Sequence, residues 1–154
     1  MKSMYLFLLA AVLGAALPPQ SRAADLSVHG VDFGIYRIEG DGPSREARLL
    51  QKTDRIPLQR GTTFGIMVDI HGAKDGRERM LRKITRFPAP GLKNSQTGKT
   101  RPYSETLVTV RDGDLLHGLF TFDHAWEMVP GTWSIEYWLG DEKLIGKQFT
   151  VVKP

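Results

Sequence analysis

The chain has 154 residues, of which 21 are Lys or Arg and 17 are Asp or Glu, and its formal net charge is +4. This length is typical of one domain. Hydrophobic residues make up 41% of the sequence and charged residues 25%, which excludes collagen-like, disordered and polytopic membrane proteins. The sequence contains no Cys, which excludes a disulfide scaffold, a Cys-ligated zinc site and a thiol nucleophile.

The first 23 residues are expected to be a secretory signal peptide. Lys2 precedes the uncharged segment Met4–Leu17, which is shorter than the roughly 20 residues of a membrane-spanning helix. Small residues predict cleavage after Ala23, with cleavage after Ala24 as the close alternative and an uncleaved membrane anchor as the other interpretation. Residues 24–154 are then expected to form one domain with a net charge of +2. We therefore predict a bacterial protein, periplasmic or secreted, with no transmembrane segment after cleavage.

The first half of the remaining chain is predicted to form β-strands. Apolar residues alternate along Asp25–Ile38, and the alternation shifts at His29-Gly30, which predicts a β-bulge. Glu46–Thr53 is a weaker strand, and Pro57 restricts the next segment to a sheet edge or a connection. The clearest strand is Phe64–Ile70, whose period of two predicts one buried face.

The middle of the chain combines an ambiguous segment with a predicted hairpin. Glu78–Phe87 has an apolar spacing that fits a helix about as well as a strand, and the surrounding strands favour an edge strand. Gly91–Pro102 has the composition of a polar loop. Thr106–Val110 and Leu115–Phe122 are expected to pair as a hairpin across the turn Asp112-Gly113.

The last third of the chain ends in a second predicted hairpin. Asp123–Val129 is a short connection whose length fits one helical turn. Trp133, Ile135 and Tyr137 then alternate with polar residues, and a final strand ends at Val152. Short strands separated by turn signals, without a long amphipathic helix, predict an all-β sandwich of about 7–8 antiparallel strands.

Two groups of residues resemble known families. Gly131 and Trp133, in a Gly-x-Trp pattern followed by Phe149–Val151, are similar to the closing hairpin of immunoglobulin-like sandwiches, although the Cys pair of antibody domains is absent. The chain after residue 23 also resembles a small bacterial family, domain of unknown function 3859. The residues that carry this second resemblance are Gly30–Tyr36, Ile56–Leu58, Arg60–Gly65, Phe87–Gly98 and the closing hairpin. It implies an exported immunoglobulin-like β-sandwich, and it brings no activity, cofactor or catalytic residue.

Histidines and acids raise the question of metal binding or hydrolysis. The four His residues show no His-x-His or His-x-x-x-His spacing, so scattered His is favoured over a copper or zinc site. If a metal binds, His117, Asp123 and His124 are the densest candidates. Asp112 and Asp114 fit a tight turn better than a calcium loop. Because no Gly-x-Ser-x-Gly motif is present and acids cannot be paired across strands from sequence, we expect no catalytic residue and no enzyme.

Three Trp residues offer flat rings of the kind that stack on sugars. Trp133 alternates with apolar residues and is expected in the core, whereas Trp126 lies in the connection before it. Trp138 shares its strand face with Ser134 and Glu136. On that face it is either an exposed contact or packing material, and packing is favoured.

Charge is segregated along the chain. Residues 24–71 carry a net charge of −1, residues 72–111 carry +7 and residues 112–154 carry −4. This concentration predicts a positive strip that attracts an anionic surface. The alternative is a solvated edge strand in which basic side chains block edge-to-edge pairing. The basic residues are densest at Lys74, Arg77, Arg79, Arg82, Lys83 and Arg86, followed by Lys93, Lys99 and Arg101.

These observations favour a non-catalytic binding module of the bacterial envelope that contacts an anionic partner through its basic central segment. The partner is expected to be an envelope protein or an anionic component such as lipid head groups, lipopolysaccharide or peptidoglycan. The export signal disfavours nucleic acid, and no cofactor is expected. A periplasmic copper- or zinc-binding protein is the first alternative, and a cell-wall hydrolase is the second.

Overall fold

The computed structural model describes residues 26–40, 46–72 and 76–154, which form strands and one short 3-10 turn. The predicted signal peptide, residues 1–23, lies outside the described residues. In the described part of the chain, no helix has the length and apolar character needed to cross a membrane. The elements are β1 (Ser27–Glu39), β2 (Glu46–Gln51), β3 (Arg55–Pro57), β4 (Thr63–His71), β5 (Arg79–Arg86), β6 (Leu92–Lys93), β7 (Thr100–Arg101), β8 (Tyr103–Val110), β9 (Leu115–Thr121), η3 (Ala125–Glu127), β10 (Gly131–Leu139) and β11 (Glu142–Val152).

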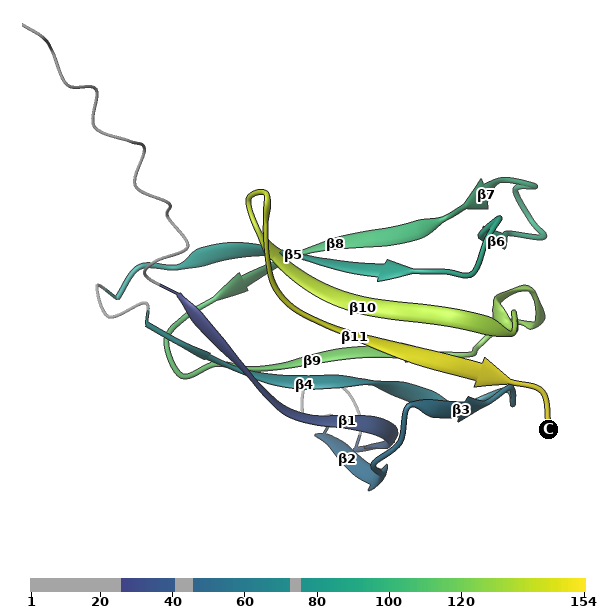
Figure 1. Ribbon diagram of the computed structural model, residues 1–154, viewed down its shortest axis with the longest axis horizontal. Helices are drawn as coiled ribbons and strands as arrows, with labels where there is room; N and C mark the ends of the chain where they lie inside the picture. The colour runs from purple at the N-terminus through teal and green to yellow at the C-terminus, as the bar shows by residue number, and fades with distance from the viewer. Residues whose placement is uncertain (1–25, 41–45, 73–75) are drawn as a thin grey trace, which may run out of the picture.

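Two sheets lie face to face, so the predicted all-β sandwich is confirmed (Figure 1). The first sheet has four strands in the order β2-β1-β4-β9, and the second has five in the order β3-β11-β10-β5-β8. The β6–β7 hairpin extends from the end of the sandwich (Figure 1). The short strand β3 lies at an edge, parallel to β11, which confirms the position predicted from Pro57. All other strand pairs are antiparallel in the described residues.

The bulge predicted near the start of the first strand is present. Gly30 pairs with Val68 on β4, but the next paired residue of β1 is Asp32, which faces Met67. One extra residue of β1 therefore lies between two consecutive pairs, which is the definition of a β-bulge. The extra residue restores the alternation, so that Phe33 packs against the core.

Aromatic packing around Trp133 joins the two sheets. Trp133 is fully buried in β10, and its indole nitrogen donates a hydrogen bond to the carbonyl of Val129 at 2.9 Å. Three of the surrounding rings belong to the β4–β9 side of the sandwich, so this side chain of the second sheet packs directly against the first sheet. The ring centroids lie 5.0–5.8 Å from that of Trp133, in Phe64, Phe87, Phe120 and Phe122.

The expectation of an edge strand at Glu78–Phe87 is wrong. β5 lies inside the five-stranded sheet, where Ile84 pairs with Glu136 of β10 on one side and with Glu105 of β8 on the other. The strand that lies at this edge is β8. The alternative in which the basic residues protect an exposed edge is therefore excluded for β5.

The expected hairpin across Asp112-Gly113 is also wrong, because β8 and β9 belong to different sheets. The turn between them is bonded to the end of β4 instead of closing a two-stranded ladder. Asp112 Oδ1 accepts the backbone N–H of Gly72 at 2.8 Å, and the N–H of Gly113 donates to the carbonyl of Ile70 at 2.7 Å. These bonds allow the chain to cross from one sheet to the other. The predicted loop Gly91–Pro102 contains the β6–β7 hairpin.

Candidate functional site

The predicted basic segment is carried mainly by β5. Lys74 lies outside the described residues, and Arg77 precedes the strand in an exposed position. Arg79 begins the strand, and its guanidinium donates to the backbone carbonyl of Arg77 at 3.3 Å. The remaining predicted residues, Arg82, Lys83 and Arg86, all lie within β5.

The alternation of β5 divides these basic side chains between two faces of the sheet. Lys83 lies opposite Tyr137, a core residue that is 1% exposed, so Lys83 points to the inner face. Burial lowers the pKa of the Lys83 ammonium below its ordinary value. Arg82 and Arg86 lie on the outer face, on either side of Ile84. The predicted strip is therefore divided between the two faces of β5, where Arg82 and Arg86 share the outer face and Lys83 does not.

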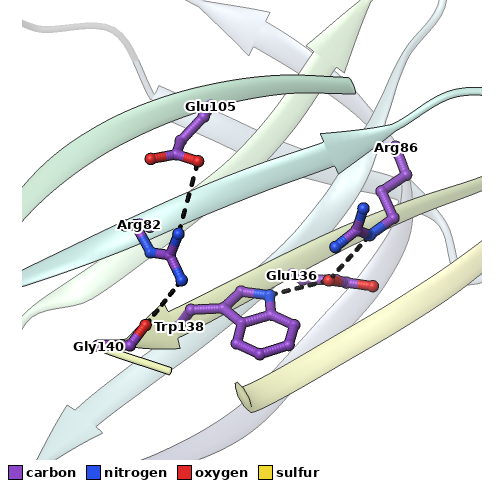
Figure 2. Close-up of polar contacts among 6 residues, drawn as sticks. All are labelled: Arg82, Arg86, Glu105, Glu136, Trp138 and Gly140. Carbon is purple, nitrogen blue, oxygen red and sulfur yellow. Dashed lines mark hydrogen bonds and ion pairs between the residues drawn. The ribbon is translucent and has the colours of Figure 1, made fainter. Parts of the chain in front are cut away.

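Arg82 is held over the sheet by two neighbours (Figure 2). Its Nη2 donates a hydrogen bond to the carbonyl oxygen of Gly140 at 2.7 Å, in the turn between β10 and β11. Its Nη1 lies 3.7 Å from a carboxylate oxygen of Glu105 on β8, and both side chains are 35% exposed. The backbone contact fixes the position of the guanidinium, whereas the ion pair is long and solvated.

Glu136 is a buried carboxylate at the centre of this face (Figure 2). Its Oε2 accepts a hydrogen bond from the indole N–H of Trp138 at 2.8 Å and lies 3.3 Å from Nε of Arg86. Its Oε1 accepts a hydrogen bond from the hydroxyl of Ser134 at 3.2 Å. Burial acts to raise the pKa of Glu136, but the bond from Trp138, the charge of Arg86, the bond from Ser134 and the charge of Lys143 outweigh it and lower the pKa. Glu136 is therefore ionised at neutral pH and orients its neighbours.

A shallow pocket of about 200 Å³ lies on the same outer face. Arg86 places its guanidinium carbon 5.8 Å from the centroid of the Tyr103 ring, a cation–π arrangement, and Tyr103 is 44% exposed. The pocket thus combines guanidinium donors with two aromatic rings, which suits a ligand carrying a carboxylate or phosphate next to a flat surface. Its lining residues are Arg82, Ile84, Arg86, Tyr103, Glu105 and Trp138.

The three Trp residues have different environments. Trp133 is a core residue, as predicted. Trp138 shares its face with Glu136, also as predicted, and it is half-buried. Its indole N–H donates to Glu136, and the residue lines the pocket. Trp126 lies in η3, where its ring stacks on His124 with centroids 5.6 Å apart and planes 9° apart.

The weak metal candidates lie at the end of β9 and after it. His117 is exposed within β9, whereas Asp123 and His124 follow the strand. The backbone N–H groups of Asp123 and His124 both donate to Oε2 of Glu127 at 2.8 Å, and the carbonyl of Asp123 accepts a bond from Arg60. Within residues 26–40, 46–72 and 76–154, no group of three His, Asp or Glu side chains could hold a metal ion.

Sequence reasoning missed the cross-strand partners of the site. Arg82 meets Glu105 of β8 and the carbonyl of Gly140, and Arg86 meets the ring of Tyr103. These contacts exist only because the strands pair in this order. The period of two within β8 places Tyr103 and Glu105 on one face, but nothing in the sequence shows that this face adjoins Arg82. The period of two in the sequence did predict that Glu136 and Trp138 share one face of their strand, and the structure confirms this.

Comparisons with solved structures agree with the two-sheet architecture. A crystal structure of an immunoglobulin-like protein from Pseudomonas aeruginosa aligns with a TM-score of 0.65 and 23% identity, covering 86% of this chain and 100% of that chain. This likeness shows an immunoglobulin-like fold. A β-glucosidase from Listeria innocua aligns with a TM-score of 0.42 and 9% identity over 82% of this chain and 16% of that chain. A β-D-glucoside glucohydrolase from Trichoderma reesei gives a TM-score of 0.38 and 13% identity over 82% and 19%. These two scores are too low to bear on function.

Sequence comparison identifies the family. No curated protein matches the sequence significantly. The model of the family described as Domain of unknown function (DUF3859) matches residues 28–151, a range that begins in β1 and ends in β11. The match therefore spans the whole sandwich, and the resemblance found in the sequence is confirmed. The chain belongs to the DUF3859 family and has an immunoglobulin-like β-sandwich fold.

Proposed function

We propose that this protein is an exported, non-catalytic binding module of the bacterial envelope that contacts an anionic partner through the outer face of its five-stranded sheet. The observation that supports the proposal is the pocket in which Arg82 and Arg86 lie beside the rings of Trp138 and Tyr103. A guanidinium presents N–H donors in a planar fork that matches carboxylate and phosphate groups. Neighbouring aromatic rings add a flat contact area next to these donors.

The two arginines differ in how readily they can contact a partner. Arg86 lies 3.3 Å from the buried carboxylate of Glu136, so a partner's anionic group must share this guanidinium with an internal carboxylate. The 3.7 Å separation of Arg82 and Glu105 is longer than the roughly 2.7–2.9 Å of a charge-assisted hydrogen bond. Exposed ion pairs contribute only about 0–1 kcal/mol. An external carboxylate or phosphate can therefore replace Glu105 at little cost, which makes Arg82 the main contact.

Charge reversal at Arg82 tests the proposal. Co-sedimentation of residues 24–154 with isolated envelope membranes and peptidoglycan measures the bound fraction at low and high salt. We expect Arg82→Glu to weaken binding about tenfold or more, equivalent to about 1.4 kcal/mol, and added salt to weaken binding of the unmodified protein. The matched control is Arg48→Glu, which makes the same charge change at an exposed position on β2 of the other sheet.

A second variant tests the competition between Glu105 and the partner. Glu105→Gln removes the internal carboxylate that faces Arg82, so we expect binding to strengthen severalfold. Equal losses in Arg82→Glu and Arg48→Glu would show that net charge, and not this face, drives binding. Unchanged binding in Arg82→Glu would refute the proposal.

A further inference from the structure

A second pocket, of about 260 Å³, lies at the end of the sandwich where the β6–β7 hairpin meets η3. It shares no lining residue with the pocket around Arg82. Both sheets contribute to its walls, since Ser104 belongs to β8 and Phe120 belongs to β9, while Phe87 directly follows β5. Leu92 of β6 and Trp126 of η3 complete the apolar lining. The pocket therefore lies between the two sheets.

The walls favour an apolar occupant. The rings of Phe87 and Phe120 lie 6.0 Å apart, and both pack against the core around Trp133. Leu92 is 4% exposed, so the hairpin is anchored to the rest of the protein. An apolar cavity of about 150 Å³ is large enough to bind benzene. The pocket can therefore hold an aromatic ring together with a short chain.

The β6–β7 hairpin has a defined turn that positions two cations beside this pocket. Asn94 Oδ1 accepts the backbone N–H groups of Gln96 and Thr97 at 2.8 and 2.9 Å, and the N–H of Asn94 donates to the carbonyl of Lys99 at 2.9 Å. Lys99 and Arg101 are exposed, and both line the pocket. Two cationic residues that reach solvent therefore contribute to the lining of the pocket.

These two cations have no ion-pair partner in the part of the chain that the structure describes. In the described ranges, neither the ammonium of Lys99 nor the guanidinium of Arg101 takes part in an ion pair. Glu127 is the only acidic residue that lines the pocket in those ranges, and its Oε2 accepts the backbone N–H groups of Asp123 and His124. The lining therefore combines two cationic residues with one carboxylate, which leaves it a net positive charge.

We propose that this pocket binds a small amphipathic carboxylate, with its apolar, ring-containing body against Phe87, Phe120 and Trp126. The carboxylate of the ligand lies at the opening, between Lys99 and Arg101. The apolar walls supply the driving force, and the two cations select an anionic head group over a neutral one. This site is independent of the outer-face contact proposed above.

The test uses two probes of matched shape, 4-phenylbutyrate and 4-phenylbutanol. Each is titrated into the protein while the chemical shifts of the backbone amides and of the Trp indole N–H groups are followed by NMR. For a ligand this small we expect a dissociation constant on the order of 1 mM for the acid. Saturable shifts should concentrate on Phe120, Trp126 and the β6–β7 hairpin. The alcohol, which lacks the charge, should bind at least tenfold more weakly.

Variants separate the head-group contact from the apolar pocket. The double variant Lys99→Met and Arg101→Met keeps the aliphatic stems and should weaken the acid about tenfold while leaving the alcohol unchanged. Lys93→Met removes one positive charge from the same hairpin at a residue that does not line the pocket, and it should have no effect. The proposal is overturned by the absence of saturation up to about 10 mM, ten times the expected constant. Equal binding of acid and alcohol, or shifts confined to Trp138, would overturn it equally.

Discussion

The sharpest physical consequence of the structure concerns the buried carboxylate of Glu136, and the substitution Glu136→Gln isolates its charge. Glutamine has nearly the same shape as glutamate. Its amide oxygen can accept from Trp138 and Arg86, and its amide nitrogen can donate to the hydroxyl of Ser134. The hydrogen-bonding pattern survives, so the measured loss reports the charge.

The size of the loss follows from the three contacts of Glu136. A hydrogen bond to a charged group contributes about 1.5–3 kcal/mol, and a neutral one about 0.5–1.5 kcal/mol. When glutamine replaces glutamate, the hydrogen bonds with Trp138 and Ser134 no longer involve a charged group, which costs about 1 kcal/mol each. The ion pair with Arg86 adds little to this loss because the Arg86 side chain is 48% exposed. An amide is easier to bury than a carboxylate, which offsets part of the loss. We expect Glu136→Gln to lower the free energy of unfolding by about 1–2 kcal/mol at pH 7.

The loss should depend on pH in a defined direction. The pKa of Glu136 is held below its ordinary value of 4.5, so the stability that its charge contributes is complete above that value. It disappears as the pH falls through the lowered pKa of the folded protein, whereas glutamine does not titrate. The difference between the two proteins should therefore shrink toward zero in acid.

Urea unfolding followed by Trp fluorescence at pH 7 and in acid measures this difference in stability. The slope of the unfolding free energy against urea concentration should be the same for both proteins, which checks that they unfold alike. Glu105→Gln is the matched control, since its side chain is 35% exposed and its pair with Arg82 is long, so we expect a loss of less than about 1 kcal/mol. A loss for Glu136→Gln that is the same at both pH values, or no loss at pH 7, would refute the assigned role of the carboxylate.

Three further substitutions and one mass measurement test the fold and its processing. Trp133→Ala should lower the free energy of unfolding by about 3–5 kcal/mol in the same urea assay, because the ring is fully buried, and a loss below about 1 kcal/mol would contradict its central position. Gly65→Ala should prevent normal packing of β4 and lower the melting temperature strongly, because its Cβ would lie 2.0 Å from a carbonyl oxygen of β9. Gly61→Ala, with no atom within 4 Å of its Cβ, should cost only about 1 kcal/mol, and equal costs at the two glycines would refute the close approach. Intact mass of the exported protein should match a chain that begins at Ala24, and retention of the leading residues would contradict the predicted cleavage.

Local patterns predicted those features that depend on the strand period alone. The shift of alternation at His29-Gly30 predicted the bulge, and the apolar positions around Trp133 predicted which face of β10 is buried. The same period placed Glu136 and Trp138 together on the opposite face. These predictions hold because successive side chains of any strand point to alternate faces, whatever the partner strand is.

Patterns along the chain did not predict how the strands are ordered. The density of Arg and Lys in β5 suggested an exposed edge, but β5 pairs with β10 on one side and β8 on the other. Basic side chains are compatible with this internal position because the side chains of a strand point out of the sheet plane. The turn residues Asp112-Gly113 suggested a hairpin, although they join two different sheets. Turn residues indicate that the chain reverses direction, but they do not indicate which strand the next segment pairs with.

The sequence by itself determined a β-rich chain of the DUF3859 family, the buried face of its clearest strands and the concentration of positive charge in residues 72–111. Only the tertiary structure decided where that charge acts. It turned Lys83 inward, placed Arg82 against Glu105 and Gly140, and left Lys99 and Arg101 beside an aromatic pocket. The physical reason is that the partners of these side chains come from other strands: Arg82 meets Gly140 across 58 residues of chain and Arg86 meets Glu136 across 50. Contacts over such separations are set by sheet order and register, which no local spacing encodes.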